Sequence, residues 1–144
     1  MKFVCNSEDK LEDVVVEVLK KISKREYAVV FGLYGDLGSG KTTFTKRLAK
    51  AVGILDVITS PTFMLQKRFE IDFNGFKNLY HLDMYRFEEE SEVKCLDWEN
   101  TISNPENIVV VEWPDRVEGA MPDHIIRLYF KTIDETTREI EVVE

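Results

Sequence analysis

The first half of the chain alternates apolar runs with amphipathic segments, a pattern that predicts strands alternating with helices. Residues 2–5 predict a short edge strand, and acidic residues then open a helix that Asn6 or Ser7 can cap. Residues 27–34 (YAVVFGLY) are almost all apolar, which is typical of a strand buried on both faces. The apolar stripe of the first helix contains Leu11, Val14 or Val15, Val18 and Ile22.

A second helix is predicted after the buried strand, and Gly53 is placed to end it. Its apolar face is formed by Phe44, Leu48, Ala49 and Val52. Residues 56–58 then predict a short strand, and residues 59–63 (TSPTF) predict a loop, because Pro61 disfavours helical geometry in the residue before it.

The second half of the chain predicts mainly antiparallel pairs. Residues 64–73 and 77–85 should form a hairpin, because Asn74-Gly75 between them is a strong turn signal. The polar segment 86–107 predicts one or two short helices. Residues 108–111 (IVVV) predict a buried strand that ends at Glu112-Trp113.

A final strand pair is predicted at residues 124–133 and 138–143, around a polar turn at 134–136. The fold class is therefore α/β: a three-layer P-loop NTPase-like sandwich with a mixed parallel and antiparallel sheet. A ligand should bind at the carboxyl ends of its strands. The length of 144 residues suits a single domain over residues 1–144.

The segment Gly35–Thr42 (GDLGSGKT) matches the phosphate-binding pattern G-x-x-x-x-G-K-[ST]. A buried strand precedes it and an amphipathic helix follows, which is the required context. Its glycines allow successive backbone N–H groups to surround phosphate oxygens at the positive end of the helix. The residues expected to bind nucleotide here are Gly35, Asp36, Leu37, Gly38, Ser39, Gly40, Lys41, Thr42 and Thr43.

Within this loop, Lys41 should reach the β- and γ-phosphates, and the Thr42 hydroxyl should ligate Mg²⁺. Hydrolysis needs a further acid near the metal, at the end of a neighbouring strand. Glu112 follows the IVVV run, and Asp83 follows a weaker strand, so both remain candidates for catalysis and for Mg²⁺.

Other side chains near these acids could contribute to the site. Trp113 could stack on the ligand or shield phosphates from water, and it could equally be a core residue. We expect His81 to orient a neighbouring side chain or to pack within its strand, with a catalytic base as the alternative. Arg86 or Arg116 could contact the γ-phosphate. Hydroxyls in reach of the metal or γ-phosphate come from Thr59, Ser60 and Thr62.

The composition narrows the function classes. A net charge of −8 disfavours tight binding to DNA or RNA by this chain alone. Two cysteines and two histidines give no zinc-binding spacing. The sequence shows no signal peptide and no membrane span, so we expect a cytoplasmic protein that binds neither membranes nor DNA.

Several motifs together resemble the TsaE (YjeE) family of small bacterial P-loop ATPases. They are GDLGSGKTTF, TSPTF, HLDMYR and VEWP, in this order, and they span about residues 27 to 116. The resemblance implies ATP and Mg²⁺ as ligands. It also implies functional roles for Lys41, Thr42, Thr62, Asp83, Glu112, Trp113 and Arg116.

The same resemblance implies a function. The family takes part in forming N6-threonylcarbamoyladenosine at position 37 of tRNAs that read codons starting with A. Its members bind the TsaD–TsaB pair, so tRNA would be met only through that complex. Two segments differ from the family pattern. The opening turn of the first helix, where a Thr often touches nucleotide, reads Ser7-Glu8-Asp9-Lys10, and Leu96-Asp97 replaces a usual Leu-Gly.

Two other functions remain open from the residues alone. A small-molecule kinase would need an acceptor pocket and an arginine-bearing lid, and the sequence has no inserted segment for one. A nucleotide-dependent binding module would use ATP only to set its affinity for a partner. A GTPase is disfavoured, because no N-K-x-D segment for guanine recognition is present.

Overall fold

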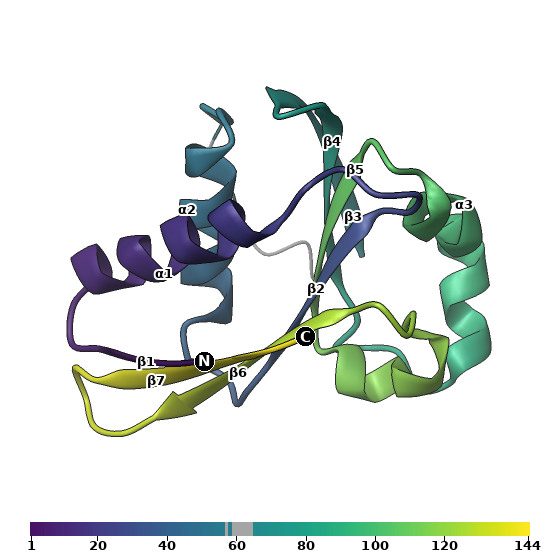
Figure 1. Ribbon diagram of the computed structural model, residues 1–144. Helices are drawn as coiled ribbons and strands as arrows, with labels where there is room; N and C mark the ends of the chain where they lie inside the picture. Colours follow the sequence, from purple (N-terminus) through teal and green to yellow (C-terminus); the bar gives the residue numbers. More distant parts are fainter. Residues whose placement is uncertain (57, 59–64) are drawn as a thin grey trace.

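The computed structural model describes residues 1–56, 58 and 65–144. A single seven-stranded sheet runs through them in the order β1-β7-β6-β2-β5-β4-β3 (Figure 1). The strands are β1 (Lys2–Cys5), β2 (Val29–Tyr34), β3 (Gln66–Phe73), β4 (Phe76–Asp83), β5 (Asn107–Glu112), β6 (Ile126–Thr132) and β7 (Arg138–Val143).

The centre of the sheet is parallel and its edges are antiparallel. Strand β2 pairs in parallel with both β5 and β6, and β5 pairs in parallel with β4. Towards the edges, β3 pairs with β4, β7 with β6 and β1 with β7, all antiparallel. The mixed sheet predicted from the sequence is therefore confirmed, and β1 is an edge strand as expected.

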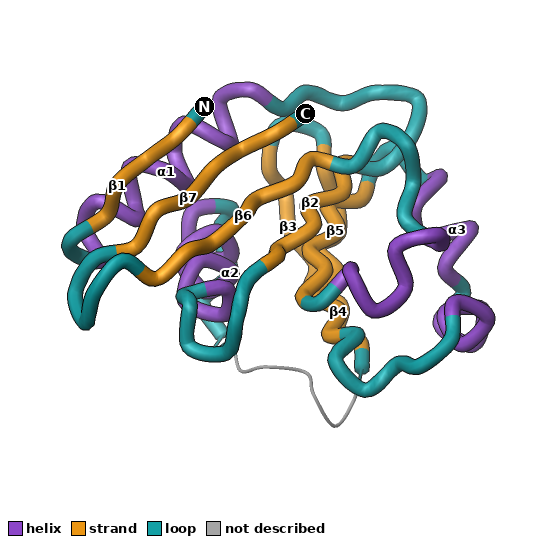
Figure 2. The backbone as a smooth tube through the Cα atoms, turned by 90° about the horizontal axis from the view of Figure 1, so that it is seen from below, coloured by secondary structure: helices purple, strands orange, loops and turns teal. Residues whose placement is uncertain are grey.

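Helices cover both faces of the sheet (Figures 1 and 2). On one face lie α1 (Glu8–Lys21) and α2 (Lys41–Ala51), and on the other lie η1 (Glu90–Leu96), α3 (Trp98–Ser103) and η2 (Pro114–Ala120). Each face has its own buried apolar cluster: Phe31, Leu48 and Val110 belong to the first, and Trp98 and Val111 to the second. The three layers match the predicted architecture.

Local chemistry accounts for several element boundaries. The Ser7 side chain accepts a hydrogen bond from the backbone N–H of Lys10 at 3.4 Å, so Ser7 is the cap of α1. Asn74 and Gly75 both have positive φ, 49° and 88°, as a tight hairpin turn between β3 and β4 requires. Asp97 has φ 55°, so it adopts the left-handed conformation that glycine favours.

Some predicted boundaries change in the structure. Asp56 and Ile58 lie outside any strand, and residue 57 between them lies outside the described part of the chain. The predicted TSPTF loop, with Thr59, Ser60 and Thr62, also lies outside it. The polar segment 86–107 was predicted to form one or two short helices, and it forms two, η1 and α3.

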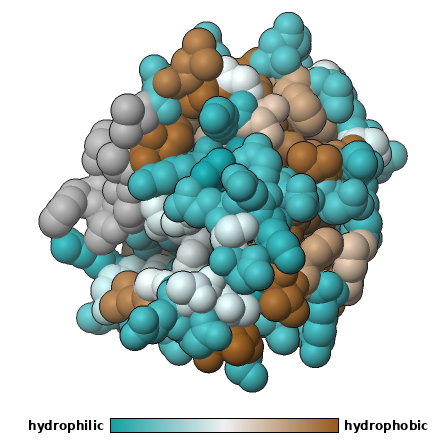
Figure 3. All heavy atoms as spheres, turned by 90° about the vertical axis from the view of Figure 1, so that its left-hand side faces the viewer, coloured by the Kyte–Doolittle hydropathy of each residue, from teal (hydrophilic) through white to brown (hydrophobic). Residues whose placement is uncertain are grey.

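The side of the molecule that carries α1 is mostly hydrophilic, with hydrophobic residues in separate small groups (Figure 3). None of the helices in the described part is long and apolar enough to cross a bilayer.

Candidate nucleotide-binding site

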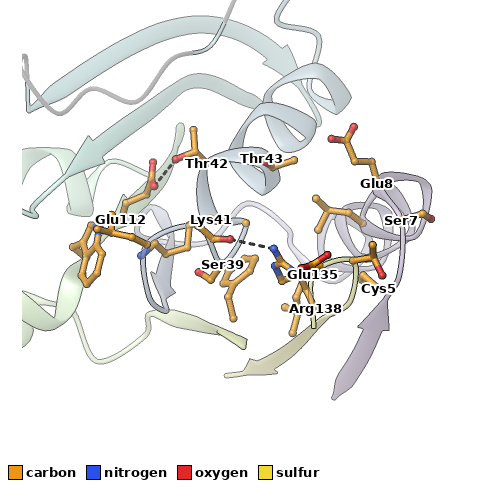
Figure 4. A pocket seen from close by; sticks show the side chains of 18 of the residues that line it. Cys5, Ser7, Glu8, Ser39, Lys41, Thr42, Thr43, Glu112, Glu135 and Arg138 are labelled. Carbon is orange, nitrogen blue, oxygen red and sulfur yellow. Dashed lines mark hydrogen bonds between the residues drawn. The ribbon is translucent and has the colours of Figure 1, made fainter. Parts of the chain in front are cut away.

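A cavity of about 660 Å³ opens at the carboxyl end of β2, where the glycine-rich loop leads into α2 (Figure 4). The loop and the start of α2 contribute Leu37, Gly38, Ser39, Gly40, Lys41, Thr42 and Thr43 to its lining. The ends of β4 and β5 contribute Asp83, Tyr85, Glu112 and Trp113. Gly35 and Asp36, also expected to bind nucleotide, are outside this lining.

The loop has the backbone of a phosphate-binding cradle. Gly38 and Gly40 have φ values of 76° and 106°, which side chains would strain, and Gly40 is the residue from which α2 begins. At Gly35 a side chain is excluded by space, because a Cβ would lie 2.7 Å from the Phe130 carbonyl oxygen. The Ser39 hydroxyl is buried and has no hydrogen-bond partner in the described part. A phosphate oxygen could accept a hydrogen bond from it.

Lys41 lies under the loop with its ammonium group in the site. It is only 5% exposed, its Nζ donates a hydrogen bond to the Gly35 carbonyl, and Nζ lies 3.5 Å from the centroid of the Trp113 ring. Burial lowers the pKa of Lys41, and the nearby negative charge of Glu112 opposes this effect. A buried cation held between the Gly35 carbonyl and the Trp113 ring is well suited to receive a phosphate.

The sheet register brings the two candidate acids together. Asp83 at the end of β4 pairs with Glu112 at the end of β5, and both are buried, at 4% and 3% exposure. The Thr42 hydroxyl donates to Glu112 Oε1 at 2.9 Å. The carboxylate of Asp83 also accepts the backbone N–H of Tyr85. The sequence left Asp83 and Glu112 as competing candidates, and the structure places both beside the loop.

The remaining predicted residues lie at different distances from this centre. His81 lies in β4, and its Nε2 is 2.6 Å from Glu112 Oε2. The ring of Tyr85 lies 5.0 Å from that of Trp113, and the Arg116 guanidinium lies 5.1 Å from Tyr85. Arg116 is thus near the mouth, outside the cavity lining. Thr62 belongs to the residues that the structure does not describe.

The opposite end of the cavity is built by residues that sequence reasoning did not select. They come from β1, the start of α1 and the β6–β7 hairpin: Cys5, Ser7, Glu8, Leu11, Phe130, Glu135, Thr136, Arg138 and Ile140. Only the family pattern at Ser7-Glu8 gave a signal for this end. The others are far from the loop in sequence, and no local motif marks them.

The donor atoms suit a magnesium nucleotide. Hydroxyl and carboxylate oxygens are the ligands that Mg²⁺ prefers, and Thr42, Asp83 and Glu112 provide them. Among the described residues, no three His, Cys, Asp or Glu side chains are grouped to hold a metal ion by themselves.

Fold and site together define the class: a P-loop nucleotide-binding α/β protein. The family model "Threonylcarbamoyl adenosine biosynthesis protein TsaE" matches residues 5–140. The chain therefore belongs to the TsaE family, as the sequence motifs had indicated.

Named relatives agree with this assignment, and a solved structure agrees with the fold. TsaE of Bacillus subtilis (strain 168) is 39% identical over 111 residues, which are 77% of this chain and 66% of that protein. TsaE of Haemophilus influenzae is 31% identical over 127 residues, 88% of this chain and 77% of that protein. The crystal structure of Bacillus subtilis YdiB matches the fold, with a TM-score of 0.75 at 24% identity over 99% of this chain and 83% of that one.

Proposed function

We propose that this protein binds and hydrolyses ATP as a component of the system that forms N6-threonylcarbamoyladenosine in tRNA. The observation that carries the proposal is the convergence of Lys41, Thr42, Asp83 and Glu112 at one end of the phosphate cradle. The relatives' name, tRNA threonylcarbamoyladenosine biosynthesis protein, supports the biological role. By the family resemblance, the partners are TsaD- and TsaB-like proteins, and tRNA is met through them in the cytoplasm.

Each residue has a proposed part in hydrolysis. The loop backbone and Lys41 bind the phosphates, and Thr42 and Glu112, with Asp83 beside them, would hold Mg²⁺. Bound Mg²⁺ neutralises charge that develops on the phosphate oxygens. Asp83 or Glu112 positions the attacking water, with Thr62 as a further contributor. Trp113 covers Lys41 and limits the access of bulk water. Arg116, near the mouth of the cavity, would contact the nucleotide.

Thr42 and Glu112 lie beside each other in the site, because the Thr42 hydroxyl donates to Glu112 Oε1 at 2.9 Å. From the family resemblance, we propose that turnover is slow for the isolated chain and faster in the assembled complex.

The test is reconstitution of tRNA modification from purified components with and without this chain. Glu112→Gln should still bind ATP but lower the ATPase rate by more than about 100-fold, since even residues that only support metal ligands contribute 10–100-fold. Glu99→Gln, on the exposed surface of α3, is the matched control and should keep the full rate. Repeated modification cycles without the chain would reject the role.

A binding module without useful turnover gives a different result. Glu112→Gln would then support modification as well as the wild type, although its hydrolysis was lost. Measuring ATP consumption and modified tRNA in the same reaction separates the two functions.

A further inference from the structure

One buried contact in the site has no part in the function described so far. The His81 side chain is 1% exposed and the Glu112 side chain 4%, and His81 Nε2 lies 2.6 Å from Glu112 Oε2. His81 and Asp83 are two residues apart on β4, so both side chains point to the face of the sheet that α2 covers. The imidazole therefore lies directly behind the carboxylate that faces Thr42.

The chemistry of the pair determines which nitrogen carries the proton. An ionised carboxylate can only accept hydrogen bonds, so Nε2 must be the donor. The other ring nitrogen, Nδ1, is buried and has no hydrogen-bond partner within the described part of the chain. A proton on Nδ1 would be a buried donor without an acceptor, which is costly. The contacts therefore place a proton on Nε2, the ring nitrogen that faces Glu112.

This arrangement divides the two oxygens of Glu112 between two donors. Oε2 accepts from His81, and Oε1 accepts from the Thr42 hydroxyl. With Oε2 held from behind, the carboxylate cannot rotate without losing a buried hydrogen bond. A merely apolar core position would not need histidine there, because burying a polar ring is unfavourable unless it is hydrogen-bonded.

We propose that His81 is a positioning residue that fixes the Glu112 carboxylate so that Oε1 faces the metal position beside Thr42. The proposal rests on the proposed function, because it assigns a role in metal binding to a residue behind a proposed ligand. Residues that orient metal ligands in this way typically contribute 10–100-fold to metal affinity.

The test measures Mn²⁺ binding, by electron paramagnetic resonance, to the full chain saturated with a non-hydrolysable ATP analogue. His81→Leu removes the donor and should weaken Mn²⁺ binding about 10- to 100-fold. His81→Gln can place an amide N–H near the position of Nε2 and should recover most of the affinity. His81→Asn is too short to reach Glu112 and should behave like His81→Leu.

Binding of the analogue without divalent metal is the second readout. It should stay unchanged in all three variants, because the loop and Lys41 are intact. The matched control is His124→Gln, at the other histidine, which stacks on Tyr27 at 3.7 Å and is outside the cavity lining. Its Mn²⁺ affinity should equal that of the wild type.

Equal Mn²⁺ affinity in the wild type and His81→Leu would overturn the proposal, as would equal losses with and without metal. If the variants do not fold, the ¹⁵N NMR signals of the His81 ring in the wild type still test the proposal. The spectrum of His124→Gln identifies which signals belong to His81. A proton on Nε2 is expected, and a proton only on Nδ1 would contradict the proposal. A wild type that binds no nucleotide at all would instead reject the proposed function.

Discussion

The two ends of the nucleotide cavity differ in how they are built. The inner end, formed by Lys41, Thr42, Asp83 and Glu112, stands on the central parallel strands and the start of α2. Lys41, Asp83 and Glu112 there are between 3% and 5% exposed. The polar residues of the outer end, Ser7, Glu8, Glu135, Thr136 and Arg138, stand on a helix cap and around a hairpin turn, and most of them are exposed.

This difference has energetic consequences. Charges at the inner end are shielded from water, so their interactions with each other and with phosphates are strong, and the protein loses stability by burying them. Charges at the outer end are hydrated, so each contact there contributes little. We therefore expect that removing a buried charge at the inner end greatly weakens function but raises the stability of the protein. Substitutions at the outer end should have small effects.

The strongest test of this contrast is Lys41→Met, which keeps the length of the side chain and removes its charge. Nucleotide affinity should fall about 10- to 100-fold or more, because each hydrogen bond from a charged group contributes about 1.5–3 kcal/mol. Isothermal titration calorimetry measures the loss. Lys46→Met, on the exposed side of α2, is the control and should bind normally.

The same Lys41→Met variant should unfold at a higher temperature than the wild type in the absence of nucleotide. Burial lowers the pKa of Lys41, so the folded protein binds this proton less tightly than the unfolded chain. The charged lysine therefore lowers stability at neutral pH, and this loss shrinks as pH rises from the lowered pKa to the usual pKa of lysine. The gain in the variant should shrink in alkaline buffer. A variant less stable than the wild type at neutral pH would contradict this account.

A smaller effect is expected for Arg138→Ala at the outer end. Arg138 Nη2 donates to the Gly38 carbonyl at 3.4 Å, and Nη1 donates to the Asp134 carbonyl at 2.8 Å, so the side chain ties the hairpin turn to the loop. Losing such contacts should weaken nucleotide binding by about 2- to 10-fold. Lys131→Ala, on an exposed position of β6, should have no effect. A loss as large as that of Lys41→Met would remove the distinction between the two ends.

The smallest effect is expected for Arg47→Ala, which affects stability more than binding. Arg47 joins α2 to α1 through ion pairs with Glu8 and with Glu12, the latter at 3.0 Å. Glu8 is 68% exposed, so the pairs together should contribute about 0.2–1 kcal/mol. The unfolding temperature should fall by a few degrees at low salt, and the difference should narrow in 1 M salt. A difference that persisted in salt would show a packing role instead.

Much of the fold was predictable because its signals are local. The alternating apolar spacings placed β2, α1 and α2, the Asn74-Gly75 turn placed the β3–β4 hairpin, and Ser7 was one of two expected caps. The prediction of a short strand at 56–58 was wrong at its two described residues, because neither Asp56 nor Ile58 lies in a strand. Three residues are too few for periodicity to distinguish a strand from an extended loop.

The sequence by itself determined the glycine loop with Lys41 and Thr42, because strand, loop and helix are consecutive and their spacing alone specifies the chemistry. Only the tertiary structure decided that β5 lies between β2 and β4. That order puts Asp83 beside Glu112 and places His81 behind it, and it lets a distant hairpin close the cavity with Arg138. These contacts depend on the pairing of strands far apart in the chain, and a local pattern of apolar residues carries no information about which strands will pair.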